Sequence, residues 1–256
     1  MIGAWSLSGG PLDPERDLRA LRAATGPAPA LETRRLWLGG ARVSQDRRGV
    51  AGLVGFAVGG LEALLAGETP EGSYVAVRGD GQERLTLLRC PSGGERLYLA
   101  RLGEVVYFAS SVRSLLPLVG RRLNGAVLDE VLLNGRVLLG SGTLHEGIDE
   151  VLAGHQVELG ETVAPQTFSQ PEILRSPVGS LSELARGCRD RLTEAVVRAA
   201  GAQRPVAVAL SGGIDSSAVA AAAVDAFGAD QVEALTYEFH DPTHGTEVDY
   251  ARQVCQ

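Results

Sequence analysis

The segment Ser211–Ser217 has the residue types and the spacing of a backbone anion site. It reads Ser-Gly-Gly-Ile-Asp-Ser-Ser. Gly212 and Gly213 allow the main chain to adopt positive φ angles and to approach a ligand closely. Ser216 and Ser217 are expected in the first turn of a helix, where backbone N–H groups lack partners and the helix dipole is positive. Amides, hydroxyls and a helix terminus together predict a site for a phosphate-like anion.

Two regular elements are expected to hold this segment. The residues Val206–Leu210 form an unbroken apolar run after Pro205, which predicts a buried parallel strand. The alanine-rich residues Ala218–Phe227 follow the loop and predict a helix. A strand–turn–helix order places the loop beyond the carboxyl end of the strand, where parallel sheets bind ligands. A glycine-rich turn without a ligand is the alternative.

The loop lacks the lysine and the spacing of the Walker-type phosphate loop. It resembles the PP-loop of ATP pyrophosphatases, S-G-G-[IL]-D-S-S, which cleave ATP between the α- and β-phosphates and adenylate a carboxylate or similar oxygen. The resemblance implies an ATP and pyrophosphate site formed by Leu210, Ser211, Gly212, Gly213, Asp215, Ser216, Ser217 and Tyr237.

The resemblance also implies a role for Asp215 as a ligand of Mg²⁺, because a hard cation that bridges phosphates prefers carboxylate oxygen. Helix capping is the alternative role for this aspartate.

A second strand is predicted over Gln231–Phe239, followed by a polar turn and a helix that opens at Thr246. By resemblance, the backbones of Leu210 and Tyr237, near the ends of the two strands, would contact adenine and ribose. His240 and His244 lie in the turn, and we interpret them as polar loop residues, with a contact to substrate or nucleotide as the alternative.

Upstream of the loop, Ser180 and Glu183 have the spacing of a helix capping box. Apolar residues follow at helical spacing, so we expect this helix, to about Ala200, to bury its apolar stripe in the core. The proline-containing residues 169–179 are interpreted as a linker. The expected domains are therefore residues 1–168 and 180–256.

Residues 1–168 are rich in short apolar runs and glycine turns, which indicates an α+β domain with antiparallel sheets. Strands are predicted at Gly3–Leu7, Arg35–Leu38, Leu53–Val58, Ser73–Val77, Glu83–Arg89, Arg96–Arg101, Val105–Ala109 and His155–Leu159. Helices are predicted at Pro14–Ala24, Gly60–Ala66, Ser111–Val119 and Ala126–Asn134.

Several segments of this domain resemble asparagine-synthetase-like proteins, in their order and in their spacing ahead of the loop. They are Leu88–Ala100, Tyr107–Leu116, Thr143–Ile148, Ala153–His155 and, more faintly, Leu38–Val43. The resemblance implies an Ntn-type (αββα) glutamine amidotransferase domain. It would be followed by the start of an α/β PP-loop domain of the adenine nucleotide α-hydrolase-like type.

The departures from this family concern its glutaminase site. Residue 2, the nucleophilic cysteine in glutamine-hydrolysing members, is Ile2. The aspartate that would hold the amino group of glutamine is Cys90, and the family's N-G-E segment has no counterpart between Arg47 and Ser73. Arg42 matches an arginine that pairs with the glutamine carboxylate, with a structural role as the alternative. We therefore expect a structural domain without glutaminase activity.

Composition limits the classes of function. The net charge of −7 disfavours nucleic-acid binding as the main task. No apolar run has the roughly 20 residues that a membrane span needs, and the three cysteines lack metal spacing, as expected of a cytoplasmic protein. All 24 basic residues are arginines, so a step that needs lysine requires another segment or chain.

The resemblance implies an ATP-dependent amide-bond synthetase that uses ATP and Mg²⁺. Two branches of the family have lost the same cysteine, the lasso-type peptide cyclases and the β-lactam synthetases, and our interpretation is a lasso-type cyclase. β-Lactam synthetase, an ammonia-using asparagine synthetase homologue, another PP-loop enzyme and a non-catalytic scaffolding subunit are alternatives. Because two parallel strands leave an open sheet, we expect a partner: the remainder of the synthetase domain, in the same parent chain or in a second polypeptide. A second Mg²⁺ carboxylate, a catalytic lysine and most of the pocket for a peptide or amino-acid-like substrate would lie there, so this chain alone is expected to be inactive.

Overall fold

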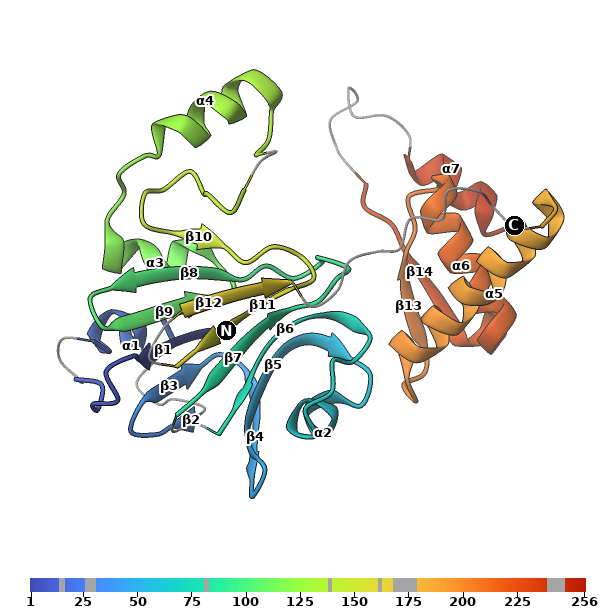
Figure 1. Ribbon diagram of the computed structural model, residues 1–256. Coiled ribbons are helices and arrows are strands. Elements are labelled where there is room, and N and C mark those ends of the chain that lie inside the picture. The colour runs from blue at the N-terminus through green and yellow to red at the C-terminus, as the bar shows by residue number, and fades with distance from the viewer. Residues whose placement is uncertain are drawn as a thin grey trace. The chain divides into compact units, whose positions relative to one another are not determined.

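The computed structural model describes residues 1–13, 17–25, 31–80, 83–137, 140–160, 163–167, 179–238 and 247–256. The chain divides into two compact units, Met1–Glu172 and Ile173–Gln256 (Figure 1). The residues expected to form the linker lie outside the described ranges except for Gly179.

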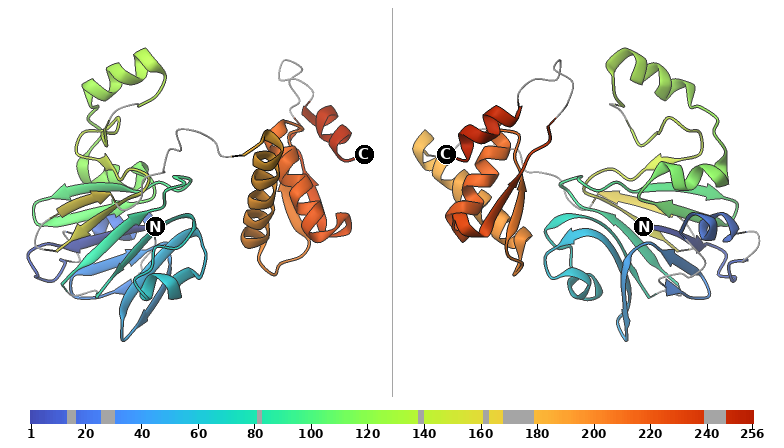
Figure 2. Two further views of the ribbon diagram at one scale, coloured as in Figure 1. Left: turned by 45° about the vertical axis from the view of Figure 1, so that its right-hand side comes forward. Right: turned by 180° about the vertical axis from the view of Figure 1, so that it is seen from behind.

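The first unit contains two antiparallel sheets of six strands each (Figures 1 and 2). The first sheet has the order β10-β8-β9-β1-β3-β2, with β1 Ile2–Ser6, β2 Leu31–Glu32, β3 Leu36–Gly39, β8 Tyr98–Leu102, β9 Val105–Ala109 and β10 Asp149–Glu150. The second has the order β12-β11-β7-β6-β5-β4, with β4 Arg42–Asp46, β5 Gly49–Ala57, β6 Gly72–Gly79, β7 Leu85–Arg89, β11 His155–Leu159 and β12 Val163–Thr167. An α+β domain with antiparallel sheets is thus confirmed.

Alternation along the central strands sends apolar side chains to both faces of the first sheet. In β1, Trp5 packs in a core shared with Val75 and Val77 of the second sheet, whereas its neighbour Ala4 packs in a separate cluster with Trp37. A one-residue shift in register would exchange these two sets, so burial on both faces fixes the pairing.

Helices cover the outer faces. The cluster outside the first sheet includes Leu21 of α1 (Arg19–Thr25) and Leu115 of α3 (Val112–Val119). Outside the second sheet, Leu64 of α2 (Gly60–Leu65) packs against strand residues. The order of layers is therefore helix, sheet, sheet, helix. The helix α4 (Gly125–Asn134) follows, and of its residues only Val127 is buried.

All eight strands predicted in this unit are present, with ends shifted by a few residues. Sequence reasoning missed β2, β4, β10 and β12. Two of these have only two residues, and β12 contains Pro165, which an edge strand tolerates because one side of it makes no ladder hydrogen bonds. The predicted helix at Pro14–Ala24 begins only at Arg19, and residues 14–16 lie outside the described ranges.

A buried arginine joins the ends of the two sheets. Arg35 precedes β3 and donates hydrogen bonds to the carbonyl oxygens of Ser6 (2.9 Å), the last residue of β1, and of Leu7 (3.2 Å), which follows it. Its guanidinium also lies 4.6 Å from the centroid of the Trp5 ring, an arrangement that favours a cation.

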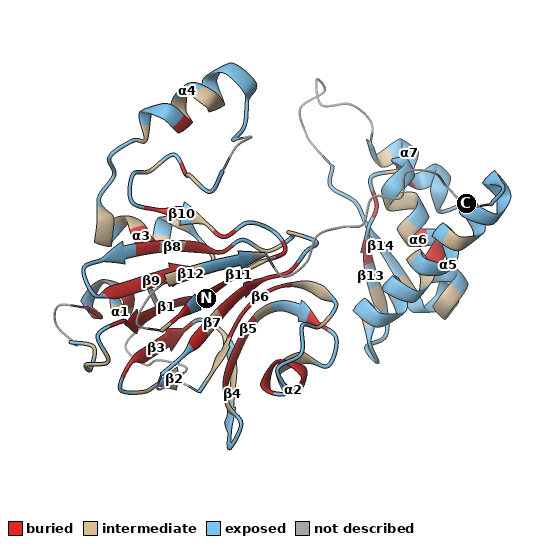
Figure 3. Ribbon diagram, viewed as in Figure 1, coloured by how far each residue is buried: buried red, intermediate tan, exposed pale blue. Residues whose placement is uncertain are grey.

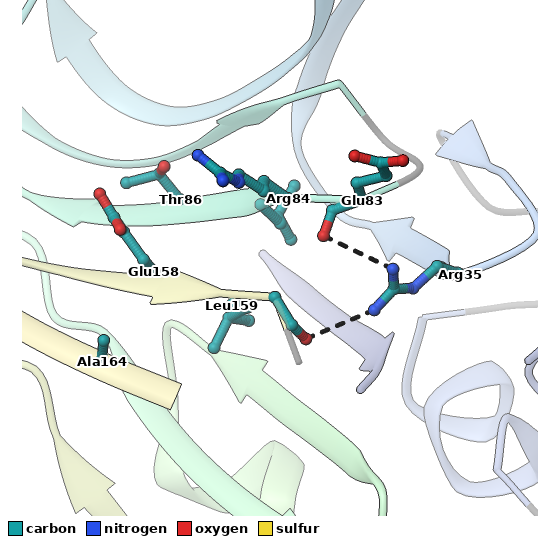
Figure 4. Close-up of a pocket in the computed structure, with 9 residues that line it drawn as sticks. Arg35, Glu83, Arg84, Thr86, Glu158, Leu159 and Ala164 are labelled. Atoms are coloured by element: carbon teal, nitrogen blue, oxygen red, sulfur yellow. Dashed lines mark hydrogen bonds between the residues drawn. The ribbon is translucent and has the colours of Figure 1, made fainter. Parts of the chain in front are cut away.

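The same guanidinium reaches the second sheet. Arg35 donates to the carbonyl oxygens of Glu83 (3.5 Å), just before β7, and of Gly160 (3.3 Å), just after β11 (Figure 4). A polar cavity of about 760 Å³ opens beside these bonds and is also lined by Arg84 and Glu158. Arg35 therefore clamps the two sheets together through main-chain atoms.

The second unit contains a two-stranded parallel sheet and three α-helices in the described ranges. They are α5 Leu181–Ala200, β13 Val206–Ala209, α6 Ile214–Phe227, β14 Val232–Leu235 and α7 Glu247–Val254, with a 3₁₀ turn at Ala229–Gln231 before β14. Val206 pairs with Val232 and Ala209 with Leu235, so β13, α6 and β14 form a β–α–β unit. Its core gathers Val208, Leu210, Ala220, Ala223 and Ala251.

Two expectations for this unit are wrong. No residue of α5 is fully buried, although its apolar stripe was expected in the core (Figure 3). Val196 of the stripe is partly buried against the core cluster of this unit. Leu181 of that stripe is 84% exposed. The second predicted strand ends at Leu235 rather than Phe239, because only four residue pairs hydrogen-bond with β13.

The capping box of α5 is confirmed. The backbone N–H of Glu183 donates to Ser180 Oγ (3.3 Å), and the backbone N–H of Ser180 donates to Glu183 Oε2 (2.7 Å). These bonds satisfy donors that a helix N-terminus leaves unpaired.

No helix in the described ranges combines the length and the apolar character that crossing a membrane requires.

The Arg35 clamp can be tested by the substitution Arg35→Met. The variant leaves buried carbonyl groups without a donor, so the free energy of unfolding should fall by about 2 to 4 kcal/mol. Urea denaturation would measure this change. The neighbouring Arg34 is exposed, and Arg34→Met should stay within about 0.5 kcal/mol of the unsubstituted protein. Equal losses in both variants would contradict a specific role for Arg35.

The capping box predicts a pH dependence. The hydrogen bonds from the Ser180 backbone N–H and hydroxyl lower the pKa of Glu183 below its ordinary value. Because the folded pKa is lowered, the contribution to stability is present above the unfolded pKa and is lost as the pH falls through the folded value. An NMR titration should show this low pKa, and Ser180→Ala should raise it. Ser182→Ala, two residues further along and exposed, should leave it unchanged.

Candidate functional site

The predicted anion loop lies between the carboxyl end of β13 and the first turn of α6. The N-cap of α6 is Gly213, with φ −73° and ψ 162°, and the helix begins at Ile214. Among the described residues, the backbone N–H groups of Gly212, Ile214, Asp215 and Ser216 have no hydrogen-bond partner. Four free amides at the positive end of a 14-residue helix can bind the oxygens of a phosphate.

Gly212 is a position that only glycine fits. Its φ of +78° lies in the left-handed region, which a side chain disfavours. A Cβ built there would lie 2.4 Å from Cβ of Tyr250 and 2.7 Å from the backbone nitrogen of Ala251, both in α7. The backbones of the loop and of α7 are therefore in direct contact, and the glycine is required on two independent grounds.

The hydroxyls of Ser211 and Ser216 cross-link the loop. Ser216 Oγ accepts a hydrogen bond from the backbone N–H of Ser211 (3.2 Å), and the two hydroxyl oxygens are 3.0 Å apart. The N–H of Gly213 donates to Ser211 Oγ (3.4 Å), and Ser216 Oγ donates to the Gly213 carbonyl oxygen (3.2 Å). The sequence predicted that these hydroxyls would bind the anion, whereas in this structure they form hydrogen bonds within the loop.

Ser217 differs from its prediction. Its backbone N–H donates to the carbonyl oxygen of Gly213 (3.0 Å), because it is the first residue of α6 within reach of an intrahelical acceptor. Its N–H is thus not available to an anion. Its hydroxyl oxygen is buried and has no hydrogen-bond partner. An unsatisfied buried hydroxyl costs free energy and is consistent with a polar ligand or a side-chain rotation at this turn.

Asp215 lies in the first turn of α6 with an exposed side chain. Its carboxylate makes no hydrogen bond or ion pair with another described residue. It does not cap the helix, because the N-cap is Gly213. No group of three or more His, Cys, Asp or Glu residues in the described ranges could hold a metal ion. A cation at Asp215 would therefore need oxygens from a bound phosphate and from groups outside these ranges.

The other two predicted contacts lie at the ends of the strands. Leu210 is 3% exposed; its N–H donates to the Leu235 carbonyl oxygen (2.8 Å), and its own carbonyl oxygen accepts from Thr236 Oγ1 (2.7 Å). Its N–H is therefore occupied, whereas the second lone pair of its carbonyl can still accept a ligand. Tyr237 follows the end of β14 and is 79% exposed. His240, His244 and Thr246 lie outside the described residues.

Sequence reasoning missed three residues around the loop. Thr236 is bonded to Leu210, and Tyr250 and Ala251 contact Gly212. The position of Thr236, just after an apolar strand, is the signal that could have found it. The contact of α7 is a tertiary one, and no local pattern in the sequence indicates it.

Three residues that the sequence resemblance related to a glutaminase site make structural contacts. Ile2, in place of the nucleophile, is 2% exposed within β1. Cys90 is fully buried, with its Sγ accepting from the backbone N–H of Tyr74 (3.1 Å) and 3.1 Å from Ser92 Oγ. Arg42 donates to the carbonyl oxygen of Gly55 (2.6 Å). Each of the three residues thus has a structural role in this structure.

The steric requirement at residue 212 can be tested with Gly212→Ala. The substitution adds backbone strain and a clash with α7, so the second unit should lose stability beyond the roughly 1 kcal/mol of a strained φ alone. Gly228, at the end of α6, has φ +85° but no atom within 4 Å of a built Cβ. Gly228→Ala therefore adds backbone strain without a clash, and thermal unfolding should show the larger loss of stability in Gly212→Ala. Similar losses in the two variants would mean that α7 does not contact the loop.

Comparison with known protein families finds a match within the second unit. The asparagine synthase family model matches residues 187–256. A curated relative, the amidase chyE of Penicillium rubens, is 39% identical over 90 residues, which are 33% of this chain and 13% of that protein. The chain thus spans a small part of the relative that it matches.

Two solved structures are similar at a low level. The glutamine phosphoribosylpyrophosphate amidotransferase of B. subtilis, complexed with ADP and GMP, has a TM-score of 0.38 and 10% identity, over 93% of this chain and 65% of that one. A structure described as the allosteric regulatory enzyme of purine biosynthesis has a TM-score of 0.34 and 11% identity, over 92% and 64%. Similarity at this level does not establish a common fold. The finding that carries weight is the match of residues 187–256 to the asparagine synthase family.

Proposed function

We propose that the loop Ser211–Ser217 binds the phosphates of ATP, and that the chain forms part of an ATP-dependent synthetase. The main observation in support is that backbone N–H groups at the start of α6, beyond the end of a parallel strand, have no hydrogen-bond partner among the described residues. A second, independent observation is that this loop lies inside the segment that matches the asparagine synthase family.

In the proposed reaction, a carboxylate oxygen attacks the α-phosphorus of ATP. The bond between the α-phosphorus and the bridging oxygen breaks, pyrophosphate leaves and an acyl-adenylate forms. An amine then attacks the acyl carbon and releases AMP. The loop's part is to hold the departing pyrophosphate, because fixed N–H groups stabilise the negative charge that develops on it. Asp215 would hold Mg²⁺ together with phosphate oxygens.

The amine is proposed to belong to the substrate itself. The positions that would serve glutamine hydrolysis hold Ile2 and Cys90, and both side chains are buried. We favour a lasso-type peptide cyclase, in which one peptide supplies both the amine and the carboxylate. A β-lactam synthetase or an ammonia-using asparagine synthetase homologue shares the adenylation step and differs in the amine.

The two domain assignments and the partner are part of the proposal. Residues 1–168 would form the Ntn-type domain, and residues 180–256 the start of the synthetase domain, which the remainder of that domain completes. A peptide or amino-acid-like substrate would bind mostly through that remainder, whereas nucleic acid and membrane are not expected partners.

ATP–pyrophosphate exchange by the full-length protein tests the mechanism. Exchange should depend on a precursor peptide rather than on aspartate or a β-amino acid. Asp215→Asn should reduce the rate by roughly 100-fold, because a fixed charge at the transferring phosphoryl group is lost. Asp225 lies on the same helix, and its exposed ion pair with Arg189 contributes little.

Asp225→Asn is therefore the matched control and should keep the rate of the unsubstituted protein. Full exchange by the Asp215→Asn variant would remove the loop from the mechanism. Exchange that responds to aspartate, with no response to peptide, would favour the asparagine synthetase alternative.

A further inference from the structure

The helix α7 lies directly against the turn that orients the loop. A Cβ at Gly212 would be 2.4 Å from Cβ of Tyr250, 2.6 Å from its carbonyl carbon and 2.7 Å from the nitrogen of Ala251. These are mainly backbone atoms, which cannot rotate away as the end of a flexible side chain can. The left-handed turn at Gly212 is therefore fixed in part by the position of α7.

A single small residue attaches α7 to the core beneath the loop. Ala251 is 4% exposed and packs in one cluster with Val208 of β13, with Leu210 and with Ala220 of α6. Its neighbour Tyr250 is 60% exposed. Ala251, the buried residue of α7, is therefore next in sequence to Tyr250, whose atoms lie against Gly212. A movement of Ala251 would also displace the atoms that contact Gly212.

The rest of the loop already has its own restraints. The serine hydroxyls bind the amides of Ser211 and Gly213. No hydrogen bond restrains Gly212 itself, and a glycine with free rotation loses much entropy when a ligand fixes it. Packing by α7 supplies the restraint that the sequence of the loop does not.

We propose that α7 is a positioning element for the anion loop, and that Ala251 is the residue through which it acts. By holding the turn at Gly212, α7 keeps the free amides of the loop aimed at one place before a phosphate arrives. Preorganised donors bind more tightly because less ordering accompanies binding. The proposal rests on the proposed function of the loop as an ATP site.

The substitution Ala251→Gly tests this role. It removes the buried methyl group and leaves the backbone contact without its anchor. Arg252, the next residue, is exposed, so Arg252→Gly introduces a glycine into the same helix without touching the core. NMR order parameters of the Gly212 amide are measured without nucleotide, and the Kd for Mg²⁺–ATP is measured by calorimetry.

We expect the order parameter of Gly212 to be roughly 0.85 in the unsubstituted protein and in Arg252→Gly, and below about 0.6 in Ala251→Gly. Amides in the middle of α6 should remain rigid in all three proteins. The Kd for Mg²⁺–ATP should rise about tenfold in Ala251→Gly alone, because misplaced donors bind less well.

Other results overturn the proposal in distinct ways. If Gly212 stays rigid in Ala251→Gly, α7 does not position the loop. If both glycine variants loosen Gly212 equally, the helicity of α7 matters and Ala251 has no special role. If the full-length protein, which includes the remainder of the synthetase domain, does not bind ATP, the proposed function fails, and the order parameters still decide whether α7 positions the turn. Should Ala251→Gly unfold, Ala251→Ser serves in its place, because it places a hydroxyl in the apolar cluster and so weakens the anchor.

Discussion

Every sheet has two faces, and the need to cover both determines how this chain is built. In the first unit, Trp5 and Ala4 point to opposite faces of β1, and a second sheet covers one while helices cover the other. The second unit meets the same requirement less completely. There, Leu235 of β14 is 57% exposed and no residue of α5 is buried in the described ranges. The first unit is thus a closed sandwich, whereas the second presents apolar surface.

The two units also differ in the polar groups that are available to a ligand. In the first, Ile2 and Cys90, the two positions that the sequence resemblance related to a glutaminase, are buried. In the second, the amides at the start of α6 and the Ser217 hydroxyl have no hydrogen-bond partner among the described residues. A helix leaves its first N–H groups without intrahelical partners, so these amides are available to a ligand. The groups that could bind a ligand are therefore concentrated in the smaller, second unit.

Local features of the structure could be predicted from the sequence, and long-range ones could not. The capping box at Ser180 follows from a four-residue pattern, and the left-handed Gly212 from a glycine-rich turn after a strand. The burial of α5 depends on neighbours that no periodicity reveals, so the expectation for its stripe failed. Likewise, the end of β14 is set by pairing with β13. The contact between α7 and Gly212 joins residues about 40 positions apart, which explains why it was missed.

The way Arg35 binds has a consequence for which sequences this fold can accept. Its guanidinium contacts main-chain oxygens at Glu83 and Gly160, so the side chains at those two positions take no part in the bonds. A Cβ at residue 160 would meet only one atom within 4 Å, at 3.8 Å. Turns joining the strands at this end can therefore diverge in sequence while one arginine continues to hold them.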